Sequence, residues 1–145
     1  MSRGLLCAAA LSSCAHAAAT RTGPPLYGLR KSTPAEVCLP PGAQLWLSRL
    51  RCPDGAPVQI VSQEPIGPRN EPESPDDPRL LAQLDAGRPL ARGEPDLHLV
   101  NQVVVSCSDG DRTLYIDMYH CNQPPPDIPP DGLSIAPPPP APDRD

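Results

Sequence analysis

LHLVNQVVVSCSDGDRTLYIDMYHC, residues 97–121, is the longest run of strand-forming residues in the chain. Its middle holds Asp109-Gly110, and an Asp-Gly pair tolerates the positive φ angles of a tight type I′ turn. We therefore expect a β-hairpin that turns at this pair and sets Val103 opposite Ile116. The hairpin predicts a mostly β fold class, with a small α+β fold as the alternative.

The two faces of this hairpin differ in character. One face is apolar and carries Leu97, Leu99, Val103, Val105, Leu114, Ile116 and Met118. The other face is mixed and carries Val100, Gln102, Val104, Tyr115, Asp117 and Tyr119. A hairpin of this kind has one side to bury, so the mixed side is expected toward solvent. On that side Tyr115, Asp117 and Tyr119 form either a plain solvated face or a candidate binding face.

A second hairpin is predicted around Pro53-Asp54-Gly55, between the strand-like runs 45–52 and 56–62. Proline fixes φ for the turn and glycine takes its left-handed position, which suits a three-residue loop with Cys52 opposite Ala56. Both turns share the pattern Cys-x-Asp-Gly. A three-residue loop in the first hairpin, which would shift its register by one residue, is therefore the alternative.

The segments around the hairpins are rich in proline and glycine. Residues 14–35 have no periodicity and predict a flexible tether, and residues 122–145 predict a disordered Pro-rich tail. Residues 63–95 predict an insertion that contains one short helix at 78–86, with a capping Asp, a proline in the first turn and a glycine at the end. The folded domain is expected to span residues 36–121.

Composition limits what this domain can be. The chain has 145 residues, of which 24 are Pro and none is Phe, so only one small core is expected, with Trp46 inside it. Small cores need additional stabilisation, and disulfide bonds between the cysteines can supply it. The formal net charge is −5 and no basic stripe is present, which argues against nucleic-acid binding.

The first residues are typical of an export signal. Residues 1–13 combine a short positive start with an apolar run that is too short to span a membrane. Leu11-Ser12-Ser13-Cys14 resembles the lipobox of bacterial lipoproteins. The resemblance implies a lipid anchor at Cys14 in the outer membrane, facing the periplasm. The alternative is ordinary cleavage at an Ala-x-Ala site within 15–19, which would release a soluble periplasmic or secreted protein.

No motif predicts catalysis or a cofactor. Neither metal-ligand spacings such as CxxC or HExxH nor nucleophile or phosphate-binding motifs occur. In an extended hairpin His98 and His120 point to opposite faces, so no metal site is expected and disulfides are preferred for the cysteines. We expect the protein not to be an enzyme.

Four cysteines in the expected domain allow three disulfide pairings. A bond between Cys107 and Cys121 conflicts with the hairpin, because one lies beside the turn and the other about 30 Å along the returning strand. If the two hairpins pack with their turns together, Cys52 meets Cys107 and Cys38 meets Cys121. We favour this nested pairing over either of the other two.

Taken together, these features predict an exported envelope lipoprotein with a structural or protein-interacting role. Its expected partners are the membrane, through the anchor, and an envelope protein or the cell wall. The alternative is a small periplasmic inhibitor of a cell-wall hydrolase.

Overall fold

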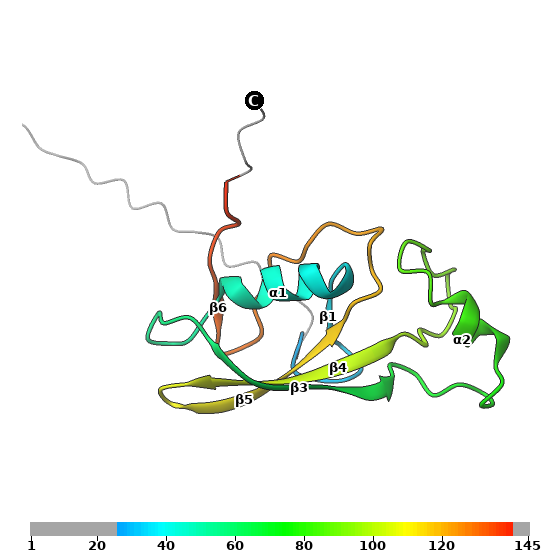
Figure 1. Cartoon of the computed structure of the whole chain (residues 1–145), viewed down its shortest axis with the longest axis horizontal. Helices are drawn as coiled ribbons and strands as arrows, with labels where there is room; N and C mark the ends of the chain where they lie inside the picture. The colour runs from blue at the N-terminus through cyan, green and yellow to red at the C-terminus, as the bar shows by residue number, and fades with distance from the viewer. Residues whose placement is uncertain (1–25, 141–145) are drawn as a thin grey trace, which may run out of the picture.

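Residues 26–140, which a computed structural model describes, contain two short helices and six strands (Figure 1). The export signal and Cys14 lie outside the described residues. In chain order the elements are β1 (Ala35–Glu36), α1 (Leu39–Arg49), β2 (Leu50–Arg51), β3 (Gln59–Pro68), α2 (Pro78–Ala82), β4 (Leu99–Cys107), β5 (Gly110–Asp117) and β6 (Ser134–Ile135). The main sheet has the order β1-β5-β4-β3, and β2 pairs with β6 separately. The mostly β fold class is confirmed.

The central hairpin is present, with a different turn. Val103 lies opposite Leu114, and Cys107 opposite Gly110, so the turn falls on Ser108-Asp109. The expected register is therefore wrong by two residues. Among the described non-glycine residues only two have positive φ, and Asp109 is not one of them, whereas Gly110 has φ +128°. Glycine thus takes the positive φ after the turn instead of within it. A shift of two leaves every side chain on its expected face.

The run 45–52 forms the end of a helix and a short strand instead of one long strand. Helix α1 begins with two prolines in its first turn, where their missing N–H groups cost nothing. Its buried apolar residues are Ala43, Trp46 and Leu47, and Leu50 follows at the same spacing. This spacing of three and four residues is helical. The turn at 53–55 survives, because Cys52 N–H donates to the carbonyl of Ala56 as expected.

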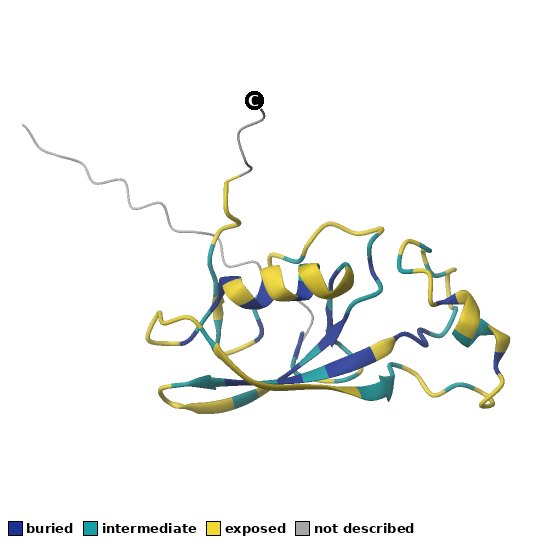
Figure 2. Cartoon of the chain, in the orientation of Figure 1, coloured by how far each residue is buried: buried dark blue, intermediate teal, exposed yellow. Residues whose placement is uncertain are grey.

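The core lies between α1 and one face of the sheet (Figures 1 and 2). Its residues are Ala35, Val37, Ala43, Trp46, Leu47, Leu50, Val103, Val105, Leu114 and Ile116. Four of them, expected on the apolar face of the central hairpin, are fully buried: Val103, Val105, Leu114 and Ile116. No helix of residues 26–140 covers the other face of the sheet (Figure 1). None of the helices in this part of the chain is long and apolar enough to cross a membrane.

The folded unit extends further than expected on both sides. Residues 26–35, expected in a tether, pack on the core through Tyr27 and Leu29 and enter the sheet as β1. Residues 122–136, expected in a disordered tail, bury Pro130 and pair as β6 with β2. Proline prevents a long ladder there but not side-chain packing. The start of the insertion, 63–68, is instead the second half of β3.

Helix α2 confirms the expected start at Pro78 and ends at Ala82, four residues earlier than predicted. Asp77 caps it by accepting a hydrogen bond from the N–H of Arg79. The segment that carries α2 lies beyond the end of the sheet (Figure 1). Of its leucines, Leu81 is 77% exposed and Leu84 is 58% exposed. Neither is buried by the sheet.

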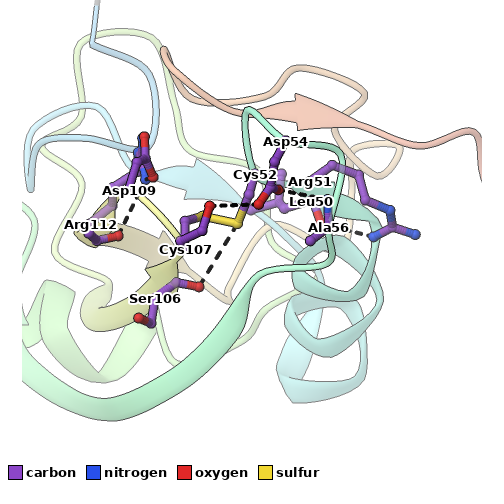
Figure 3. Close-up of a disulfide and its surroundings, with 11 residues drawn as sticks. Leu50, Arg51, Cys52, Asp54, Ala56, Ser106, Cys107, Asp109 and Arg112 are labelled. Carbon is purple, nitrogen blue, oxygen red and sulfur yellow. Dashed lines mark hydrogen bonds and ion pairs between the residues drawn. A yellow bond between two sulfur atoms is a disulfide. The ribbon is translucent and has the colours of Figure 1, made fainter.

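The disulfides join Cys38 to Cys121 and Cys52 to Cys107, which is the nested pairing favoured from the sequence. Figure 3 shows the second bond beside the turn of the central hairpin, next to the carbonyl of Ser106. Both bonds close long loops, with sequence separations of 83 and 55 between their cysteines. Bonds that close long loops restrict the unfolded chain most.

Candidate functional site

Four buried polar side chains meet at the end of the sheet opposite the hairpin turn. Asp96 and His98 come just before β4, Asp117 ends β5, and His120 follows three residues later. One ligand-type atom from each lies within 4.8 Å of the others. We call these four residues the His–Asp cluster.

The cluster forms because the chain leaves the hairpin after Asp117. Leu39 N–H donates to the carbonyl of Met118, and His120 N–H donates to that of Val37. Residues 118–120 therefore run beside the start of α1 and no longer pair with β4. The expectation that His98 and His120 point to opposite faces is wrong for this reason, since it extended strand alternation past the end of the strands.

The polar atoms of the cluster form a closed ring of short distances. Nδ1 of His98 lies 2.9 Å from Oδ1 of Asp96 and 3.7 Å from Oδ2 of Asp117. Nε2 of His120 lies 3.0 Å from Oδ2 of Asp117 and 3.6 Å from Oδ2 of Asp96. The side chains of His98 and Asp117 are 1% and 0% exposed. Each carboxylate thus lies between the two imidazoles.

One hydrogen bond and one missing hydrogen bond distinguish the two histidines. His120 Nε2 is hydrogen-bonded to Asp117, and Gln123 lies beside its Nδ1 at 3.4 Å. Neither ring nitrogen of His98 has a hydrogen-bond partner, although a carboxylate oxygen of Asp96 is close to Nδ1. That oxygen lies off the direction in which an N–H would point.

Two further charged groups surround the cluster. Arg69 donates to Asp96 at 2.9 Å and also to Glu36. Glu36 in turn lies 3.8 Å from Nδ1 of His120. Desolvation lowers the pKa of the Arg69 guanidinium, but the hydrogen bond to Glu36 and the nearby carboxylates raise it more. Arg69 is therefore a fixed positive charge that orients both carboxylates.

The cluster shifts the pKa of each of its members. Burial lowers the pKa of His98, but Asp117 and Asp96 raise it more, to about 9. The same opposing effects raise the pKa of His120 to about 10. Burial raises the pKa of Asp117, and the two histidines lower it further than burial raises it. Without another cation, both imidazoles hold a proton at neutral pH.

The cluster lies between two depressions. A polar cleft of about 460 Å³ opens on one side, with Asp96 and His120 in its wall. Other polar residues of this wall are Ser32, Glu36, Arg69, Asn70, Glu94, Asn122 and Gln123. On the other side His98 contributes to an apolar groove of about 170 Å³, whose further lining is Leu80, Leu81, Gln83, Leu84, Leu97, Leu99 and Tyr119.

The three residues expected on one binding face are not exposed together. Asp117 lies opposite Val100 as part of the mixed face, but it is fully buried within the cluster. Tyr119 stacks on the ring of His98, with ring centroids 5.0 Å apart and planes 9° from parallel. Only Tyr115 keeps its expected place, opposite Gln102 on the face without a helix.

Asp96, His98 and His120 were not expected to act together. A signal was present, because Asp96-x-His98 precedes one strand and Asp117-x-x-His120 ends its neighbour. Antiparallel pairing brings these two ends together. Comparison with protein-family models, with curated proteins and with solved structures found no match.

Proposed function

We propose that this protein is a non-enzymatic protein of the bacterial envelope, anchored by a lipid at Cys14 and acting through contact with another envelope protein. The observation that carries the proposal is the pair of disulfides, each of which fastens distant parts of the fold. Such bonds form and persist in oxidising compartments and are rare in the cytosol. An export signal at residues 1–13 accounts for that compartment.

The chemistry of the His–Asp cluster supports a role without catalysis. A general base must have an unprotonated nitrogen near neutral pH. Without a bound cation, carboxylates raise the pKa of His98 to about 9 and that of His120 to about 10, so neither imidazole is free to accept a proton. His98 and Asp117 are also shut away from the cleft by burial.

The exposed leucines support a protein partner. Leu81, Leu84 and Leu99 are 77%, 58% and 41% exposed and line one groove. Grouped exposed apolar side chains are typical of interaction sites, unlike scattered ones. The occupant that fits is an apolar segment of an envelope protein.

The anchor is tested by the intact mass of the mature protein. We expect a chain that begins at Cys14 and carries two or three acyl chains, and a Cys14→Ala variant that loses them. A soluble product that begins at Ala18 or Thr20 would contradict the anchor and leave the domain a soluble periplasmic or secreted protein.

The partner is tested by crosslinking in envelope preparations. We expect Leu81→Ser/Leu84→Ser to lose a crosslinked partner that the wild type captures. The matched control, Ile60→Ser/Val61→Ser, removes two apolar side chains that are 53% and 60% exposed on the edge strand, and should keep it. Equal capture by both variants would exclude the leucine groove. Capture of a cell-wall hydrolase that loses its activity would support the inhibitor instead.

A further inference from the structure

The His–Asp cluster brings one potential metal-ligand atom from each of four residues within 4.8 Å of the others. A zinc ion bound to two imidazole nitrogens and two carboxylate oxygens at about 2.0–2.1 Å has ligand atoms about 3.3 Å apart. The four nitrogen–oxygen distances in the cluster are 2.9, 3.0, 3.6 and 3.7 Å. These distances lie on both sides of the tetrahedral value, with Asp96 facing His98 through Oδ1 and His120 through Oδ2.

The unpartnered, buried ring of His98 is a second, independent observation that indicates a bound ligand. Its side chain is 1% exposed, and Nδ1 lies between two carboxylate oxygens without forming a hydrogen bond to either. A buried polar nitrogen without a partner is costly, and a protonated imidazole would have two such donors. A metal ion bound to Nδ1 would use its lone pair, while the flanking oxygens occupy neighbouring corners.

Charge balance allows a divalent cation at this place. Glu36, Asp96 and Asp117 supply three carboxylates, and Arg69 supplies one guanidinium. A zinc ion bound to neutral imidazoles would compensate the two remaining negative charges, as two imidazole protons do in its absence.

We propose that Asp96, His98, Asp117 and His120 bind one zinc ion in a tetrahedral site. Two imidazoles with two carboxylates suit zinc better than magnesium or calcium, which prefer oxygen ligands alone. Four protein ligands fill the coordination sphere, so the ion is structural.

The surrounding groups act as a second layer of the zinc site. Arg69 donates a hydrogen bond to the Asp96 carboxylate. Glu36 and Gln123 lie near Nδ1 of His120, the ring nitrogen that would not bind the ion. Partners of this kind orient metal ligands. The ion reaches the site from the polar cleft, whose wall contains Asp96 and His120.

Calorimetric titration of the oxidised full-length chain with zinc tests the proposal. Replacing Cys7 and Cys14 by Ala removes the other cysteines that could bind zinc. We expect one zinc ion per chain, and for cobalt the intense visible absorption of tetrahedral coordination. The isosteric variant Asp117→Asn should lose more than about 100-fold in affinity, since even second-layer changes cost 10–100-fold.

Asp76→Asn is the matched control, because it removes the same charge from an exposed carboxylate and should leave zinc affinity unchanged. If near-UV circular dichroism shows that Asp117→Asn does not fold, Glu36→Gln carries the test, with an expected loss of at least about tenfold. Absence of one-to-one binding by the parent chain would overturn the proposal. So would a folded Asp117→Asn, or Glu36→Gln in its place, that binds like the control.

Discussion

Arg49 links the last turn of α1 to a segment more than 75 residues away in sequence. Its guanidinium donates to the carbonyl of Ala136 at 2.9 Å and to the carboxylate of Asp127, and its side chain is 6% exposed. The carboxylate is 48% exposed and therefore partly hydrated. The hydrogen bond to Ala136 and the ion pair with Asp127 should therefore contribute differently to stability.

We expect Arg49→Met to lower the free energy of unfolding by about 1–3 kcal/mol, because it leaves the partly buried carbonyl of Ala136 without this donor. Asp127→Asn should cost less than about 1 kcal/mol, the usual value for an exposed ion pair. Urea unfolding of both variants measures the difference. Equal costs would mean that Arg49 acts only through the surface pair and that the carbonyl of Ala136 is satisfied by water.

The segment around α2 is held by two carboxylates whose pKa values are lowered. Hydrogen bonds from the Arg79 side chain and N–H lower the pKa of Asp77 to about 2. The N–H of Ala91, with Gln83 and Arg88, lowers the pKa of Glu94 to about 2. A lowered folded-state pKa means that the ionised group stabilises the fold above its unfolded pKa. This stabilisation is lost as the pH falls from about 4 toward 2.

Amide resonances of Arg79 and Ala91 report this titration, because both N–H groups donate to the carboxylates concerned. We expect each resonance to shift with a midpoint near pH 2. In Asp77→Asn and Glu94→Gln the corresponding shift should vanish. Midpoints near 4 in the wild type would show that neither carboxylate is held in its hydrogen bonds in solution.

The element that sequence reasoning missed is α1. Leu45 and Leu47 alternate as in a strand, and the turn at 53–55 favours a hairpin, so local signals pointed to β structure. The spacing of Ala43, Trp46, Leu47 and Leu50 is helical, and only packing against the sheet selects it. Short apolar runs do not distinguish the two periods.

The central hairpin and the disulfides were more predictable, for a geometric reason. Alternation in 97–121 assigns each side chain to a face whatever the turn, so the buried positions survive a register shift of two. The length of a strand excludes a bond between Cys107 and Cys121. The His–Asp cluster was not predictable in this way, because His120 lies where strand periodicity has ended.

At the scale of the molecule, the two disulfides fasten opposite ends of the sheet. Cys107 ends β4 at the hairpin turn, and nine residues of strand, about 30 Å, separate it from His98. Cys121 directly follows His120, and its partner Cys38 precedes α1. One bond therefore fixes the hairpin turn, and the other fixes the segment that places His120 in the cluster.

Removing either disulfide should destabilise the fold by a similar amount. Only removal of the Cys38–Cys121 bond should disturb the His–Asp cluster. Chain entropy depends on the logarithm of loop length, so separations of 83 and 55 residues each give about 4 kcal/mol. We expect Cys38→Ala/Cys121→Ala to lose hydrogen-exchange protection at the amide of His120, which donates to Val37, and to bind zinc more weakly. Cys52→Ala/Cys107→Ala should keep both properties while unfolding at a similarly reduced denaturant concentration. If the two variants lost His120 protection equally, the fold would open as one unit, and the Cys38–Cys121 bond would have no special role in holding the cluster.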